Sequence, residues 1–223
     1  WETDKSRLMP RLWQLAALAA LLCFTAGGTL LLNTRTENIT VLWPCNGLTL
    51  GVLLLAPRRH WISYISVAFA VDLAVNIVNA GAGFTLTLEI LLSLCNMLEV
   101  FLALIALTRV LPAIPDLTLS DQLLKFFFFA VLLPPALAAL LACSLVALYS
   151  HPSAFAGYGS WFAADALGIA IMTPLYLALS GRYPLRKRTP REIFGLFLMI
   201  VLLTVIVFGQ DKYPLLFAIA PLL

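Results

Sequence analysis

The chain has 223 residues, of which 62% are hydrophobic and 11% are charged, and its mean hydropathy is +0.98. This composition excludes a soluble globular protein and predicts an all-α fold, a polytopic bundle of transmembrane helices in the lipid bilayer. The net charge of +3 is small and its positive residues lie between long apolar runs, so we expect no nucleic-acid partner.

Seven apolar segments are long enough to cross a bilayer, which needs about 20 residues per helix. In chain order we expect spans at about 12–32, 40–57, 61–80, 84–108, 123–149, 159–180 and 193–209. An eighth span begins near Tyr213 and is incomplete at Leu223, and the chain opens on Trp1 in place of Met. We therefore interpret residues 1–223 as one integral membrane domain of a longer protein.

The distribution of Lys and Arg over alternate loops predicts the orientation of these spans. The side that holds only Arg35 and Lys212 is expected to be periplasmic. The N-terminus, the end of the eighth span and any downstream domain are then cytoplasmic. The other twelve positive residues define the cytoplasmic side: Lys5, Arg7, Arg11, Arg58, Arg59, Arg109, Lys125, Arg182, Arg186, Lys187, Arg188 and Arg191.

Prolines interrupt three of the predicted spans. Pro44 falls near the outer start of the second span, where its missing N–H costs little. Pro134 and Pro135 must break backbone hydrogen bonds in the fifth span, and Pro174 lies in the inner half of the sixth. We interpret these as packing features or as hinges.

Four carboxyl groups lie inside predicted spans with no Lys or Arg deep in any span to neutralise them. Helical spacing places Asp72, Asn76 and Asn79 on one stripe of the third span, and Glu89, Ser93, Asn96 and Glu99 on one stripe of the fourth. We expect these stripes to face each other across a tight turn. The rise per residue predicts that Asn46, Asn76, Glu89 and Asp165 lie in the outer half, Asp72 near the middle and Glu99 towards the cytoplasm.

The sixth span carries Asp165 on the same face as Trp161, Gly168 and Met172. Glycine allows another helix to approach closely, so this face packs against neighbouring helices or surrounds a signal site. We expect Asn46, Asp72, Asn76, Glu89 and Asp165 to meet in one polar region. The alternative is a set of interhelical hydrogen bonds that fixes only the packing.

Catalytic and metal-binding patterns are absent from the sequence. It has no zinc-protease, nucleophile-elbow, P-loop or dinucleotide-binding motif, and an aspartyl pair of Asp72 and Asp165 lacks the glycine-flanked motif such chemistry needs. The cysteines are single and lie in apolar segments, which predicts small buried side chains: Cys23, Cys45, Cys95 and Cys143. We expect no catalytic residue, no metal and no cofactor in this segment.

Several short motifs together resemble the first membrane-associated sensor (MASE) family of bacterial signalling proteins. They are Trp43-Pro44-Cys45-Asn46-Gly47, Asp72 to Asn76, Asn96 to Glu99, Arg109-Val110-Leu111-Pro112, Pro134-Pro135, and Trp161 to Pro174. The resemblance covers nearly the whole chain. It implies an eight-helix inner-membrane input domain that precedes a cytoplasmic output, most often a GGDEF diguanylate cyclase and in other members a histidine kinase.

Two functions agree with these features. The first is a sensory input domain, for which we expect three partners: a cytoplasmic output domain of the same chain, a second copy in a homodimer, and a small ligand or membrane partner. The second is a solute-binding or transporting membrane protein, although no repeated halves are visible in the sequence. The candidate signal-sensing residues are Trp43, Asn46, Asp72, Asn76, Glu89, Asn96, Glu99, Trp161 and Asp165.

Overall fold

A computed structural model describes residues 10, 12–33, 42–79, 85–112, 115–149, 152–181, 189–191, 194–195 and 198. The chain divides into two compact units, Trp1–Tyr176 and Leu177–Leu223. Most of the predicted seventh span, all of the eighth and the basic segment 182–188 lie outside the described residues. The first unit contains every candidate site residue, and the rest of the description concerns it.

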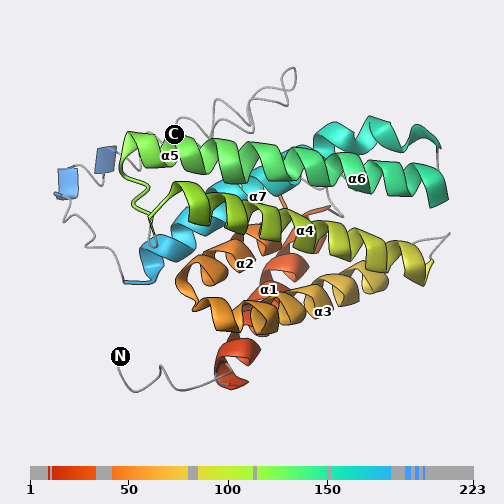
Figure 1. Ribbon diagram of the computed structural model, residues 1–223, viewed down its shortest axis with the longest axis horizontal. Helices are drawn as coiled ribbons and strands as arrows, with labels where there is room; N and C mark the ends of the chain where they lie inside the picture. Colours follow the sequence, from red (N-terminus) through yellow and green to blue (C-terminus); the bar gives the residue numbers. More distant parts are fainter. Residues whose placement is uncertain are drawn as a thin grey trace. The chain divides into compact units, whose positions relative to one another are not determined.

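Regular structure in the described residues is helical throughout (Figure 1). The α-helices are α1 (Leu12–Asn33), α2 (Pro44–Leu55), α3 (Trp61–Asn79), α4 (Leu86–Val110), α5 (Ser120–Phe126), α6 (Leu133–Tyr149) and α7 (Tyr158–Leu179). Short 3-10 helices η2 (Arg58–His60) and η4 (Pro152–Gly157) precede α3 and α7, and a π-helical segment η3 (Phe127–Leu132) joins α5 to α6.

Five of these stretches are long and apolar enough to cross a membrane: Leu12–Thr29, Arg58–Asn79, Leu86–Val110, Ser120–Tyr149 and Phe155–Leu179. They correspond to the predicted first, third, fourth, fifth and sixth spans. The expectation of an all-α membrane protein is therefore confirmed for the part of the chain that the structure describes.

The predicted second span, 40–57, is wrong in length. Helix α2 has 12 residues, which at a rise of ~1.5 Å each gives about 18 Å, well short of a bilayer core. Pro44 occupies the first turn of the helix, and Ala56 before Pro57 is extended, so prolines bound α2 at both ends. The Trp61 indole Nε1 donates to the carbonyls of Leu53 (3.1 Å) and Ala56 (3.3 Å) and satisfies the C-terminal end.

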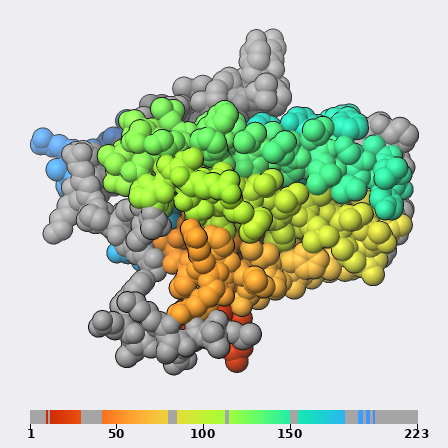
Figure 2. Space-filling view, viewed as in Figure 1, coloured from red at the N-terminus to blue at the C-terminus, as the bar shows by residue number. Residues whose placement is uncertain are grey.

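Helix α4 is central in this unit because α2, α3 and α6 all pack against it, while α1 packs on α2 and α3. The shared core contains side chains that are fully buried, among them Leu50, Leu53, Val100, Leu104 and Leu107. Many large apolar residues on the outward faces, such as Leu133, Leu137 and Leu140 of α6, remain exposed, as lipid contact requires. Figure 2 shows the side chains of α3, α4 and α5–α6 side by side along one face.

A π turn precedes the two prolines of the predicted fifth span. Figure 1 shows α5 and α6 as one long helical rod, and η3 lies directly before Pro134 and Pro135. Buried residues recur every fourth position along this rod, at Phe126, Ala130, Pro134, Ala138 and Ala142. Such a stripe would wind about 160° around a continuous α-helix of ~3.6 residues per turn. The extra residue in the π turn removes roughly 100° of that drift and keeps the stripe against α4.

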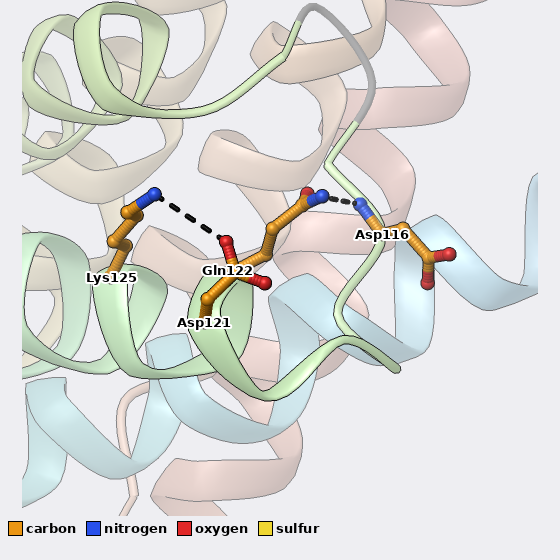
Figure 3. Close-up of polar contacts among 4 residues, drawn as sticks. All are labelled: Asp116, Asp121, Gln122 and Lys125. Atoms are coloured by element: carbon orange, nitrogen blue, oxygen red, sulfur yellow. Dashed lines mark hydrogen bonds and ion pairs between the residues drawn. The ribbon is translucent and has the colours of Figure 1, made fainter.

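The segment before α5 is held by local polar contacts (Figure 3). The backbone N–H of Asp116 donates to Gln122 Oε1 (2.8 Å), and Lys125 Nζ pairs with Asp121 Oδ2 (3.5 Å) on the exposed face of α5. The Thr118 hydroxyl (2.7 Å) and backbone N–H (3.0 Å) both donate to Asp116 Oδ1. These hydrogen bonds from Thr118 hold the pKa of Asp116 below its ordinary value.

Candidate functional site

Side chains of α3 and α4 form a continuous set of hydrogen bonds in the bundle interior. Asn96 Nδ2 donates to both oxygens of Asp72, at 3.0 and 3.1 Å. Asn76 Nδ2 donates to Ser93 Oγ at 3.0 Å and lies 3.4 Å from Asp72 Oδ2. The expectation that the two polar stripes face each other is confirmed for these four residues.

Helices α2 and α7 join this set through Glu99. Asn46 Nδ2, from the first turn of α2, donates to Glu99 Oε1 at 3.0 Å. The carboxyl group of Asp165 on α7 lies in contact with the carboxyl group of Glu99 and also with the side chain of Trp161. Asp72 is close enough to act electrostatically on both acids. We call these residues the polar cluster: Asn46, Asp72, Asn76, Ser93, Asn96, Glu99 and Asp165.

The polar cluster is held in place by a direct backbone crossing of α2 and α7. A Cβ atom added to Gly47 would overlap the carbonyl group of Gly168, and one added to Gly168 would overlap the carbonyl group of Trp43. The N–H of Trp43 donates to the carbonyl of Ala164 (3.0 Å), and Thr173 Oγ1 donates to the carbonyl of Gly47 (2.8 Å). The prediction that Gly168 permits close helix approach is confirmed.

Several buried polar atoms at this place have no hydrogen-bond partner among the described residues. Four are acceptor oxygens, on Asn46 (Oδ1), Asn96 (Oδ1), Glu99 (Oε2) and Asp165 (Oδ2). The hydroxyl of Thr49 is also unsatisfied, and the Trp43 indole N–H approaches Asp72 without completing a hydrogen bond. The cluster therefore has an excess of acceptors and of potential negative charge.

No positive side chain described by the structure balances that charge. The described Lys and Arg residues are all exposed: Arg58, Arg59, Arg109, Lys125 and Arg191. Asp72, Glu99 and Asp165 have exposed fractions of 2%, 0% and 2%, so they are also removed from bulk water. Burying acids in this way is costly unless they are protonated or meet a cationic or donor-rich partner.

The structure places Glu99 differently from expectation. Glu99 contacts Asn46 and Asp165, which were both expected in the outer half, whereas the predicted depth of Glu99 was nearer the cytoplasm; the first turn of the short helix α2 is buried in the bundle beside it. Glu89, expected in the same polar region as Asp72 and Asp165, is half-buried near the start of α4 and acts electrostatically on Asp72. Asn79 is exposed and donates to the Val75 carbonyl of its own helix.

The described residues contain no group of three His, Cys, Asp or Glu side chains close enough to hold a metal ion. Cys45, Cys95 and Cys143 are buried and free, as predicted, while Cys23 is exposed on α1. Sequence reasoning missed Thr49 and Thr173, because a threonine in an apolar span is common and carries no signal for its partner.

These features describe a multi-pass membrane domain with a polar cluster in its interior that contains three buried acidic residues. The family model for MASE1 matches residues 12–223, and the chain therefore belongs to the MASE1 family of membrane sensor domains. It is a membrane sensory input domain of a signalling protein. No curated protein and no solved structure was found to match the chain.

Proposed function

We propose that the polar cluster is the place where this sensor domain receives its signal. The observation that supports this is the set of unpartnered buried acceptors on Asn46, Asn96, Glu99 and Asp165, beside three acids without a described cation. Hydrogen bonds between transmembrane helices contribute on average only ~0.6 kcal/mol each, so packing alone gives little reason to bury three acids together.

The cluster is placed where it can change the arrangement of the bundle. Its side chains come from α2, α3, α4 and α7, so a change in its bonding alters four helices at once. A signal can shift the equilibrium between two packings only if it interacts differently with each of them. Binding or loss of a partner at Glu99 and Asp165 has this property, because it changes the contact between α4 and α7.

We further propose that the domain controls a cytoplasmic output domain of the same chain, a GGDEF diguanylate cyclase by resemblance, in a homodimer of the inner membrane. The test uses Asp165→Asn in the full-length protein, with cyclic di-GMP and protein abundance measured together. We expect output to become constant, high or low, with a change of about tenfold, which corresponds to ~1.4 kcal/mol. Normal abundance and unchanged output would show that Asp165 serves packing.

Asp121→Asn is the matched control for that experiment. Asp121 is an exposed aspartate of α5, outside the polar cluster, and its pair with Lys125 is on the surface. The same substitution there should leave output unchanged. A similar response to both substitutions would indicate a general effect of lost charge and would contradict the proposal.

The orientation inferred from the basic residues is also a proposal, with the N-terminus and the segment Gly181–Arg191 cytoplasmic. Five positive charges in that segment favour the anionic leaflet by about 1 kcal/mol each. A cysteine introduced at Thr189 should resist a membrane-impermeant thiol reagent added from the periplasmic side and react after permeabilisation. The native cysteines are replaced first. Labelling of the new cysteine from the periplasmic side would contradict the proposed orientation.

Solute binding or transport is the second candidate. One observation favours it: α2 is a short helix whose first turn, Pro44 to Gly47, is buried in the bundle, as in the discontinuous helices of transporters. Uptake of a radiolabelled solute into vesicles that depends on Asp165, together with constant output, would support this candidate over sensing.

A further inference from the structure

The Glu99–Asp165 contact joins two acidic side chains that are almost completely buried. Their exposed fractions are 0% and 2%, and each has one oxygen without a hydrogen-bond partner among the described residues. The other Glu99 oxygen, Oε1, accepts from Asn46 Nδ2 at 3.0 Å. The hydrogen bond from the backbone N–H of Trp43 to the carbonyl of Ala164 independently fixes this part of α7 beside α2.

The chemistry of this contact requires a proton. An ionised carboxylate has acceptors only, so two carboxylates cannot bond to each other, whereas an acid and a carboxylate can share one proton. The facing titratable groups are Asp72 on α3, Cys45 on α2, and Cys95 and Glu89 on α4. None of them is cationic at neutral pH. Helices α1 and α6 contain no Asp, Glu, Lys, Arg or His, and α5 has only the exposed Asp121 and Lys125.

We propose that Glu99 and Asp165 form an exchangeable proton-binding site. This inference rests on the proposed function and names the proton as the ligand of the polar cluster. In the bound state one proton lies between the two carboxyl groups; on release it passes to water and leaves two carboxylates. Polar side chains continue from the site through Asp72, Asn76 and Ser93 to the half-buried Glu89 near the α3–α4 turn, and this is the direction of exchange.

Release of the proton has a defined structural consequence. Two adjacent negative charges repel in a medium of low dielectric constant, so the contact between α4 and α7 is lost. The α2–α7 crossing contains no titratable group at its hydrogen bonds, from Trp43 N to Ala164 O and from Thr173 Oγ1 to Gly47 O. Helix α7 therefore stays attached to α2, which packs on α4, and the change is confined to the separation of the Asp165 and Glu99 side chains.

Infrared difference spectroscopy tests this proposal on the full-length protein in vesicles of phosphatidylethanolamine and phosphatidylglycerol. The wild type should show the C=O stretch of a protonated carboxylic acid that is lost as the pH rises and shifts in D₂O. The band should be absent from Glu99→Gln and from Asp165→Asn and unchanged in Asp121→Asn. In each variant the new amide can donate to the remaining carboxylate, so the fold should be retained, as circular dichroism would verify.

The outcomes separate this inference from the proposed function. A band that is present in the wild type and unchanged in both cluster variants, or absent at every pH, overturns the proton site. If output still responds to Asp165→Asn in that case, the sensing role stands. If the band behaves as expected and output is constant, the proton site stands and the sensing role fails. A band that sodium chloride removes at fixed pH, while choline chloride does not, would identify a metal cation as the ligand and overturn the proposal.

Discussion

Gly168→Ala should abolish or strongly reduce the folded protein, because the added methyl group meets the backbone carbonyl of Trp43. Overpacking a core by one methyl group usually costs ~1–3 kcal/mol, and neighbouring side chains absorb part of the strain by moving. Here the obstacle is main chain at the start of α2, so we expect a cost at or above the upper end of that range. The measurement is the fraction of monodisperse protein after extraction in mild detergent, with the thermal unfolding temperature where enough survives.

Gly159→Ala, in the same helix, is the matched control. Among the described residues, no atom outside the adjacent backbone of its own helix lies within 4 Å of a Cβ built at Gly159, so the substitution adds no clash there. Alanine is also the better helix former by roughly 1 kcal/mol, so stability should be unchanged or slightly higher. Equal loss of folded protein in both variants would mean that the α2–α7 crossing is not as close as described.

Asp72→Leu should destabilise the bundle nearly as much, for an electrostatic and hydrogen-bonding reason. Both Asn96 contacts at 3.0 and 3.1 Å disappear, and the Asn96 amide becomes an unsatisfied buried donor. Orphaning a buried polar group costs ~1–3 kcal/mol, and Asn76 also loses a contact. Asp72→Asn keeps one acceptor oxygen and should cost less. Thermal unfolding of the purified variants provides the comparison.

Asn79→Leu is the control on the same helix. Asn79 is exposed and donates to the carbonyl of Val75 within α3, so its replacement orphans no side chain among the described residues. We expect an unfolding temperature close to that of the wild type. A loss comparable with that of Asp72→Leu would show that any leucine on this stripe is harmful, and the role of the Asp72 hydrogen bonds would be refuted.

Sequence reasoning correctly predicted the features that depend on the geometry of single helices and of the short turn between two of them. Periodicity alone places Asp72 and Asn76 on one stripe and Ser93 and Asn96 on another. Because the connection between the two helices is short, they are neighbours and the two polar stripes face each other. Apolar length likewise predicted the spans that became α1, α3, α4, α5–α6 and α7. Both inferences use local geometry, which the order of residues determines directly.

The partner of Asp165 could not be predicted in the same way. Its contact with Glu99, which was expected nearer the cytoplasm, depends on how α2 and α7 pack in the bundle, which is a tertiary property. The depth estimate assumed that each helix starts at a membrane surface. Pro44 and Pro57 shorten α2 so that its first turn is buried, and Asn46 in that turn contacts Glu99.

The π turn before Pro134 divides the helical rod from Ser120 to Tyr149 into two halves. The extra residue in the turn sets how far one half is rotated about the rod axis relative to the other. If that turn became ordinary α-helix with all its residues kept, the α5 half would rotate by roughly 100° about the rod axis relative to the α6 half. Phe126 would then leave the core that it now occupies with an exposed fraction of 1%. A one-residue deletion within Phe127–Leu132 would remove that extra residue, and ordinary α-helix would then join the two halves in their present settings, with Phe126 kept in the core.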